Sequence, residues 1–247
     1  MLAFMASATH STRRSDDTRA KILNAAFTEF YRNGFQGGSL GRIVEAAEVT
    51  KGALFHHFAS KQELGYAVVD EVIGSLLEQR WLHPLTKSDD PIAEIQSAFR
   101  RFIDEDIESG AWLNGCPLNN LAQEMSPLDE GFRTRIERMY ATWRSVFSVA
   151  LRRGIERGAV RADVDPHEAA TFIVVAQMGI WGTGKYSHDD ALMRQSGEAL
   201  CWYLDTLRCT DAANVAQNDE QSAYLETTNQ LTTNSQPIHN LPNRSDT

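Results

Sequence analysis

Apolar residues recur every three or four positions along most of this chain, and that spacing limits its fold more than any other feature. Side chains three or four residues apart lie on one face of an α-helix, so the pattern marks a face that is buried. The alternation of apolar and polar residues that is typical of a half-buried strand does not stand out. The sequence therefore predicts an all-α protein.

Helix caps and breaks divide these periodic stretches into segments. We expect helices over residues 17–33, 40–47, 51–57, 61–77, 91–109, 117–125, 128–157, 166–181 and 192–207. Residues 1–15 are expected to form a flexible arm, residues 16–64 a three-helix domain, and residues 65–209 a larger helical bundle. Residues 210–247 are polar with few large apolar side chains, so they cannot bury enough surface to offset the entropy of ordering, and we expect a disordered tail.

Two short helices, residues 40–47 and 51–57, follow the first long helix and are separated by a tight turn. Ser39 and Thr50 suit their N-caps. A long helix followed by two short ones at this spacing is typical of a helix-turn-helix, whose second short helix enters the major groove of DNA. Gly52 within that helix costs about 1 kcal/mol relative to alanine, and close approach to DNA would explain its presence.

Small or polar residues on the second short helix allow its backbone to approach DNA, and helix N-termini can present N–H groups to phosphates. The residues expected to contact DNA are Ser39, Arg42, Thr50, Lys51, Gly52, Ala53, His56, His57 and Lys61. Adjacent histidines can suggest a metal site, but neighbours one residue apart on a helix point in different directions, so we expect no metal.

The net charge of −9 argues against nucleic-acid binding only if the charge is evenly spread. From Arg13 to Lys61 the chain carries eight basic and five acidic residues. The first domain is therefore basic, and the acidity lies further along the chain. This distribution is compatible with DNA binding by the first domain.

Residues 39–64 read SLGRIVEAAEVTKGALFHHFASKQEL. This stretch resembles the DNA-binding signature of TetR-type repressors in order and spacing, and the likeness extends back to about Thr18. It departs from the family at Phe55, where tyrosine is usual, and at Gly41, where a larger residue is common. The resemblance implies a ligand-responsive repressor that binds a palindromic double-stranded operator as a homodimer. It also implies that the last two helices of each chain form a four-helix interface, and that the second domain holds a ligand cavity.

Six residues are candidates for the wall of the cavity that the resemblance implies. They are Trp112, Cys116, Phe132, Tyr140, Trp143 and Trp181. For the five aromatic residues, an ordinary place in the hydrophobic core is the alternative.

Residues 115–124 read GCPLNNLAQE and resemble a motif of a TetR subgroup that includes electrophile-responsive members. Cys116 precedes Pro117 near the start of a predicted helix, whose positive end favours the reactive thiolate. The effector is therefore expected to be a small molecule or an electrophile. The alternative is that Cys116 is an ordinary buried thiol.

The three cysteines show no metal-ligand spacing, and their odd number argues against a disulfide framework, so a reducing cytoplasm is expected. The first residues lack the basic region and the long apolar run of a signal peptide. No apolar run approaches the roughly 18 residues that a membrane span needs. We expect no cofactor and no membrane partner.

No Ser-His-Asp spacing, phosphate-binding loop or paired-carboxylate motif stands out, so the chain is not expected to be an enzyme. Two alternatives stay open at this point. One is an all-α hydrolase or lyase with Cys116 as its nucleophile, and the other is an architectural DNA-binding protein without a ligand.

Overall fold

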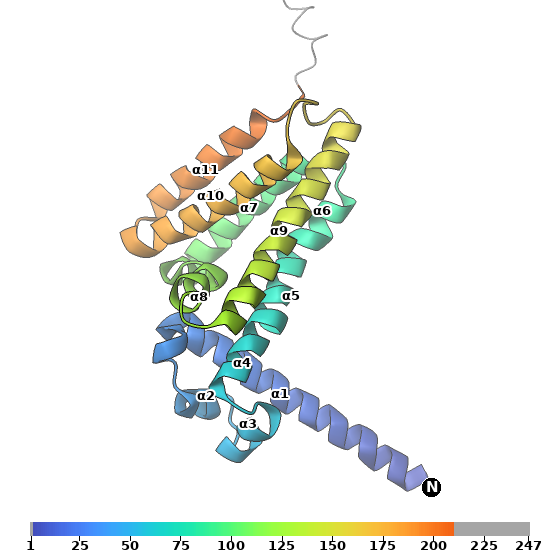
Figure 1. Ribbon diagram of the computed structural model, residues 1–247, viewed down its shortest axis with the longest axis vertical. Coiled ribbons are helices and arrows are strands. Elements are labelled where there is room, and N and C mark those ends of the chain that lie inside the picture. Colours follow the sequence, from blue (N-terminus) through green and yellow to red (C-terminus); the bar gives the residue numbers. More distant parts are fainter. Residues whose placement is uncertain (1, 210–247) are drawn as a thin grey trace, which may run out of the picture. The chain divides into compact units, whose positions relative to one another are not determined.

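Helices make up the regular structure of the computed structural model, which describes residues 2–209 and the side chains of residues 15–86 and 88–209 (Figure 1). In this range the strand-like pairing is a single antiparallel bridge between Val160 and Arg208. The predicted all-α fold is confirmed. No helix of the described part combines the length and the apolar character that crossing a membrane requires. The predicted disordered tail, residues 210–247, lies outside the described residues.

The first three helices are α1 (Leu2–Gly37), α2 (Leu40–Ala46) and α3 (Lys51–His57). The two short helices match their predicted bounds to within one residue, because their caps are local. The Ser39 hydroxyl accepts the N–H of Arg42 at 3.5 Å, and the Thr50 hydroxyl accepts that of Ala53 at 3.1 Å. Both short helices lie together at one end of the described part (Figure 1). The predicted helix-turn-helix is therefore present.

Helix α1 begins at Leu2, well before the predicted start near Asp17. Residues 2–17 contain neither glycine nor proline, so no backbone feature stops the helix there. The flexibility predicted for residues 1–15 remains a prediction. Near its other end α1 is interrupted at Gly34, where the sequence predicted that the helix ends. The φ of Gly34 is +74°, a left-handed value that glycine adopts without steric cost.

A single helical rod follows. It consists of α4 (Lys61–Ala67), the π-helical η1 (Val68–Ile73), α5 (Gly74–Leu77), the π-helical η2 (Glu78–Leu82) and α6 (His83–Lys87). The sequence predicted that the helix ends near Leu77 and that the next one begins at residue 91, so the helical structure over residues 78–87 was not predicted. Pro84 is tolerated because it lies in the first turn of α6, which follows the π-helical η2. The regular hydrogen-bond pattern is already interrupted there, so the missing N–H of proline costs less than in a helix interior.

The remaining elements are α7 (Pro91–Ser109), the 3₁₀ turn η3 (Ala111–Asn114), α8 (Pro117–Met125), α9 (Glu130–Glu156), α10 (Pro166–Ser187) and α11 (Asp190–Asp205). Helix α10 packs against α9 and α11, and α11 also packs against α7. The sequence predicted that this helix ends at residue 181, but α10 passes through Gly182 and Gly184. A Cβ at Gly184 would lie 3.0 Å from the sulfur of Met193 and 3.1 Å from the Trp112 ring. This glycine therefore allows close packing instead of ending the helix.

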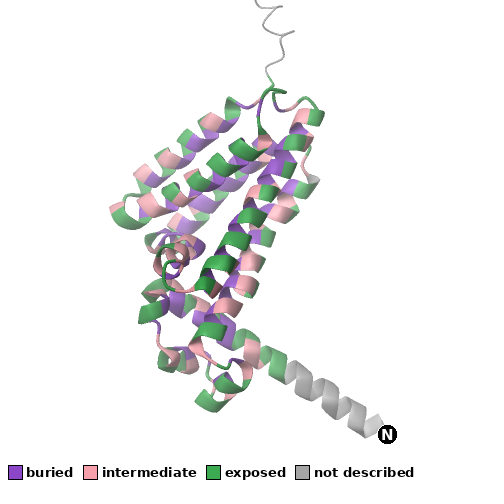
Figure 2. Ribbon diagram, viewed as in Figure 1, coloured by how far each residue is buried: buried purple, intermediate pink, exposed green. Residues whose placement is uncertain are grey.

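Buried side chains form one continuous core that includes residues of the helix-turn-helix and of the bundle (Figure 2). In the bundle, the ring centroids of Phe99, Phe102 and Phe147 lie 4.9–5.2 Å from that of Trp81. The predicted domain boundary at residues 64 and 65 falls inside α4. The division into a DNA-binding and a ligand-binding part is therefore a prediction about function and does not follow a gap in the packing.

Candidate functional site

Helix α3 places its small and polar residues on the surface. Leu54 is fully buried, whereas most of the predicted DNA-contacting residues are open to solvent. Thr50, Lys51, Gly52 and His56 are exposed, and Ala53 and His57 are half-buried. A Cβ at Gly52 would meet only the Thr50 hydroxyl, at 3.8 Å. Packing within the chain therefore does not require a glycine there, and close approach by an outside partner remains its physical explanation.

Arg42 is held by an acidic residue of α1. Its Nε and Nη2 atoms lie 2.9 and 2.5 Å from Glu29 Oε1, and Nη2 also donates to the Gly37 carbonyl at 3.1 Å. Glu29 is 9% exposed and accepts the N–H of Ser39 at 2.9 Å as well. The hydrogen bond from Arg42 holds the pKa of Glu29 below its ordinary value. These bonds fix the start of α2 against α1, so Arg42 has a positioning task beside its predicted contact with DNA.

The two lysines predicted to contact DNA differ in their surroundings. Lys51 is exposed, and its Nζ lies 6.0 Å from the Phe55 ring centroid. Lys61 is half-buried, donates to the Gln36 carbonyl at 3.2 Å, and lies 4.9 Å from the Phe35 ring centroid. Lys51 is therefore freer to reach a phosphate than Lys61.

The two adjacent histidines lie edge to face, with ring centroids 5.3 Å apart. Burial lowers the pKa of His57, and the neighbouring His56 and Arg19 lower it further. Across the described residues, no three or more histidine, cysteine or acidic side chains are grouped as metal ligands would be.

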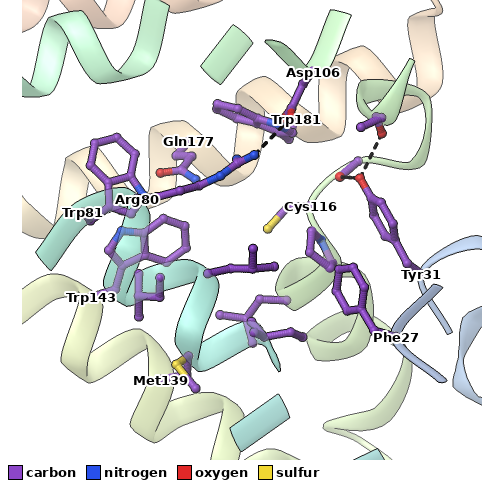
Figure 3. Close-up of a pocket in the computed structure, with 17 residues that line it drawn as sticks. Phe27, Tyr31, Arg80, Trp81, Asp106, Cys116, Met139, Trp143, Gln177 and Trp181 are labelled. Atoms are coloured by element: carbon purple, nitrogen blue, oxygen red, sulfur yellow. Dashed lines mark hydrogen bonds and ion pairs between the residues drawn. The ribbon is translucent and has the colours of Figure 1, made fainter. Parts of the chain in front are cut away.

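A cavity of about 250 Å³ lies among the bundle helices and next to α1 (Figure 3). Its wall is built by α1, the rod from η1 to η2, α7, the segment from η3 to α8, α9 and α10. The lining residues are Phe27, Tyr31, Ile73, Leu76, Leu77, Arg80, Trp81, Asp106, Ala111, Gly115, Cys116, Pro117, Leu118, Met139, Trp143, Gln177 and Trp181. Of the six residues predicted for a ligand cavity, Cys116, Trp143 and Trp181 are among them.

The other three predicted residues lie outside this lining. The Trp112 ring packs against Gly184, and Tyr140 stacks on Trp143 with ring centroids 6.2 Å apart. Phe132 lies near the start of α9 and contacts the rings of Phe35 and Tyr66. Phe132 therefore belongs to the core that joins α9 to the helix-turn-helix.

Several lining residues were not predicted from the sequence. They are Phe27, Tyr31, Arg80, Asp106 and Gln177. Two of them carry a signal that could have been noticed: Gln177 interrupts an otherwise apolar stretch, and Asp106 lies on the apolar face of α7 together with Phe99 and Phe102. A buried polar residue on such a face needs a partner, which marks it as a candidate for a site.

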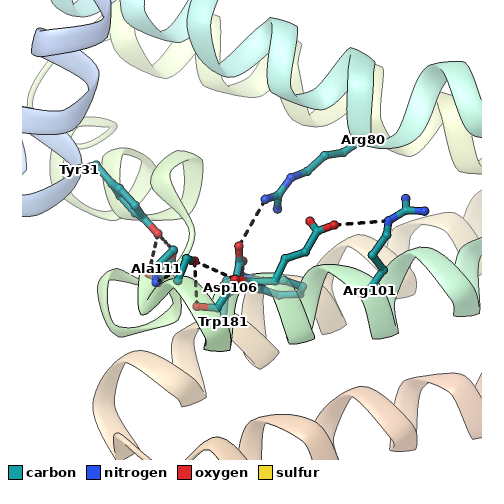
Figure 4. Close-up of polar contacts among 9 residues, drawn as sticks. Tyr31, Arg80, Arg101, Asp106, Ala111 and Trp181 are labelled. Atoms are coloured by element: carbon teal, nitrogen blue, oxygen red, sulfur yellow. Dashed lines mark hydrogen bonds and ion pairs between the residues drawn. The ribbon is translucent and has the colours of Figure 1, made fainter.

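Arg80, Asp106 and Trp181 form a polar network in the wall (Figure 4). Arg80 Nη2 lies 3.3 Å from Asp106 Oδ1, and Trp181 Nε1 donates to Asp106 Oδ2 at 2.6 Å. The Arg80 guanidinium also lies over the Phe102 ring, 4.6 Å from its centroid. Asp106 is buried, and the ion pair offsets the cost of burying its charge. The one cation and the one anion of the lining therefore neutralise each other.

Three buried polar atoms beside or in the wall have no hydrogen-bond partner among the described residues. They are Gln177 Oε1, Trp143 Nε1 and the hydroxyl of Tyr140. A buried polar group without a partner costs about 1–3 kcal/mol. A bound molecule with matching groups would remove this cost for the two that belong to the lining, Gln177 and Trp143.

Cys116 caps α8 and its side chain lies in the cavity wall (Figure 3). Burial raises the pKa of its thiol, and the N–H groups of Asn119 and Leu118, which lower the pKa, only partly oppose this effect. The sequence predicted that the helix start would favour the thiolate. That expectation was wrong in its net direction, because the loss of hydration outweighs the helix terminus, and the thiol is protonated at neutral pH.

Comparison with known proteins assigns both parts of the chain to the same kind of protein. Residues 22–68 match the family described as "Bacterial regulatory proteins, tetR family", and residues 91–200 match the "Tetracyclin repressor-like, C-terminal domain". The HTH-type transcriptional repressor DhaR of Mycobacterium sp. strain GP1 is 31% identical over 65% of this chain and 79% of its own length. The chain belongs to the TetR family of transcriptional regulators.

Further relatives agree with this assignment. The HTH-type transcriptional repressor NemR of Escherichia coli is 24% identical over 66% of this chain and 81% of its own length. Its crystal structure, described as the reduced form, has a TM-score of 0.67, 20% identity, and covers 79% of this chain and 99% of that one. A TetR-family regulator from Cytophaga hutchinsonii has a TM-score of 0.71 at 20% identity over 80% and 98% of the two chains. These structures show the fold.

In this TetR-family chain the cavity is directly connected to the helix-turn-helix. Tyr31 of α1 lines the cavity, and its hydroxyl donates to the Gly115 carbonyl at 2.6 Å and lies 2.9 Å from that of Ala111 (Figure 4). On α8, the Glu124 carboxylate accepts the N–H groups of Phe35 and Gln36, both at 2.8 Å. The segment that leads into α2 is thus attached to the helix that Cys116 caps.

The outer face of α10 and α11 carries large apolar side chains in contact with solvent. Phe172, Val175 and Trp202 are 47%, 57% and 73% exposed. TetR-family regulators form dimers, and the sequence resemblance predicted an interface made by these two helices. Leu200 of α11 is instead buried within the chain.

Proposed function

We propose that this TetR-family regulator is a repressor that binds a palindromic operator as a homodimer through α3 and releases it when a small molecule fills the cavity. The observation that supports this most is that α1, which carries the helix-turn-helix, also forms part of the cavity wall through Phe27 and Tyr31. A molecule in the cavity therefore contacts the DNA-binding part of the chain directly.

The same contacts offer a route from the cavity to the DNA. A ligand that separates Tyr31 from Gly115 shifts α1 relative to α8, and α1 positions α2 through Glu29 and Arg42. The two recognition helices of a dimer must be spaced by about one turn of DNA, 34–36 Å, to enter successive major grooves. A ligand that favours a different spacing therefore lowers operator affinity by shifting the population of dimers.

A reversible, non-covalent effector is the first choice, because the Cys116 thiol is protonated and buried. Covalent sensing of an electrophile is the second candidate, and the place of Cys116 in the cavity wall favours it. An enzyme would need a base beside this thiol. The lining holds no histidine, and Asp106 is already engaged by Arg80 and Trp181. Catalysis is accordingly not part of the proposal. Because the proposed target is DNA, the proposed place of action is the cytoplasm.

The first test is selection of bound DNA from a random pool, in which the proposal expects a palindrome.

The second test measures operator binding by Cys116→Leu, a variant that adds bulk to the cavity wall and imitates an occupied site. We expect weaker operator binding at an unchanged melting temperature. Cys116→Ala, which leaves the cavity open, is the matched control and should bind DNA as the wild type does. Equal operator affinity of all three proteins, if all are folded, would contradict the coupling of cavity and DNA.

A further inference from the structure

We propose that the cavity binds an uncharged, flat molecule of one or two rings that carries both a hydrogen-bond acceptor and a hydrogen-bond donor, as a cyclic amide does. The inference deepens the proposed function, because it names the chemistry of the effector that the cavity takes. Three properties of the lining support it: its size and shape, its two unpartnered polar groups, and its balanced charge.

The size and the walls of the cavity favour a small ring system. A dry cavity of about 150 Å³ is large enough for benzene, and this one measures about 250 Å³. The rings of Phe27, Tyr31, Trp81, Trp143 and Trp181 surround it (Figure 3). Aromatic walls prefer flat partners that stack on a ring face or meet it edge-on.

Two polar groups of the lining define the hydrogen bonds. Trp143 is 5% exposed and Gln177 is 6% exposed, and neither Trp143 Nε1 nor Gln177 Oε1 has a partner among the described residues. An indole N–H can only donate, so the ligand needs an acceptor for Trp143. The Gln177 carbonyl needs a donor. A cyclic amide offers both groups side by side and can pair with the Gln177 amide in either of its orientations.

The charges of the lining favour an uncharged ligand. Arg80 is paired with Asp106, which Trp181 also holds, so no cation of the lining is free to neutralise an anion. Burial raises the pKa of both the Tyr31 hydroxyl and the Cys116 thiol, so these groups are neutral at pH 7. A carboxylate would lose its hydration here without gaining a counter-ion.

The test measures binding of three probes of similar size to the purified full chain by calorimetry. The probes are 2-quinolinone, which has both polar groups, naphthalene, which has neither, and 2-naphthoate, which is charged. We expect 2-quinolinone to bind about tenfold tighter than naphthalene for each hydrogen bond gained, and 2-naphthoate to bind most weakly. Equal affinity of the three probes, tighter binding of the anion, or no binding of 2-quinolinone at millimolar concentration would overturn the proposal.

Two variants assign the preference to the named groups. Trp143→Phe keeps an aromatic wall without the N–H, and Gln177→Leu keeps the size of the side chain without the amide. Each should reduce the advantage of 2-quinolinone over naphthalene about tenfold, while naphthalene binds at least as well as before. Trp112→Phe, at a buried tryptophan outside the lining, is the matched control and should keep the advantage. An advantage that survives in both folded variants would contradict the proposal.

A parallel measurement of operator release separates this inference from the proposed function. If 2-quinolinone binds with the expected preference but leaves DNA bound, the ligand chemistry stands and the proposed regulation fails. If other compounds release DNA while 2-quinolinone shows no preference, the regulation stands and this inference is wrong.

Discussion

At the scale of single residues, Glu29 connects α1 to the start of α2. It accepts hydrogen bonds from Arg42, from the N–H of Ser39, and from Asn33 at 3.0 Å. Arg42 lowers the pKa of Glu29, so the stabilising contribution is complete above the ordinary glutamate pKa of about 4.3 and is lost as the pH falls through the lower pKa of the folded protein.

Glu29→Gln should therefore destabilise the protein by about 1–3 kcal/mol at pH 7 and make its melting temperature less dependent on pH below about pH 5. Thermal unfolding monitored by circular dichroism across this range measures both effects. Glu45→Gln, at an exposed position of α2, is the control and should behave as the wild type. A Glu29→Gln melting curve that follows the wild type at every pH would show that this network does not stabilise the fold.

Cys116 and Cys209 differ in burial, and their reactivity should differ in the same order. Cys116 is buried with a raised pKa, whereas Cys209 is exposed. At pH 7 iodoacetamide should modify Cys209 first, and modification of Cys116 should become appreciable only at alkaline pH, where its thiolate forms. Peptide mapping by mass spectrometry at successive times measures the order. Modification of Cys116 as fast as that of Cys209 at pH 7 would favour the covalent sensing that we place second.

At the scale of the secondary-structure elements, α3 has features of a recognition helix: one buried anchor, Leu54, and a solvent-exposed Gly52 against which only the Thr50 hydroxyl comes near, with the exposed Phe55 ring one turn further on. Lys51 lies on that face without an ion pair among the described residues, whereas Lys61 is attached to the Gln36 carbonyl. The two lysines should therefore contribute differently, although the sequence predicts DNA contact for both.

Lys51→Ala should weaken binding to all DNA sequences about equally and reduce the salt dependence of binding by about one unit, as expected when one phosphate contact is lost. Lys61→Ala should change the salt dependence less and the melting temperature more, since it removes a contact within the chain. Fluorescence anisotropy over a range of salt concentrations gives the slopes. A Lys51 variant with the slope of the wild type would exclude this lysine from the contacts.

At the scale of the whole molecule, the outer face of α10 and α11 is open to solvent in the described part of the chain, and we propose that a second copy covers it. Val175 is 57% exposed in the single chain, so aspartate there is compatible with folding of the protomer. In a dimer the same aspartate would be an unpaired charge in a dry interface, at a cost of several kcal/mol.

Val175→Asp should therefore be a folded monomer with much weaker operator binding, whereas the wild type sediments as a dimer at micromolar concentration. Val149→Asp is a matched control, since Val149 is 50% exposed on α9, away from this face. It should remain dimeric. A wild-type monomer, or a Val175→Asp dimer as stable as the wild type, would contradict the proposed interface.

The sequence alone determined the all-α class, the helix-turn-helix and the family, because these depend on local patterns. Periodicity sets which face is buried, and Ser39, Thr50 and Gly34 cap or end helices through bonds and backbone angles within a few residues. Residue spacing was enough to place the recognition helix.

Only the tertiary structure decided the length of the rod through Pro84, the continuation of α10 through Gly184 and the composition of the cavity. Each depends on neighbours that are distant in sequence: Gly184 faces Trp112, and Asp106 faces Arg80 and Trp181. The state of the Cys116 thiol is another such case, since the helix start is visible in the sequence but the burial that outweighs it arises when the helices pack around the cavity.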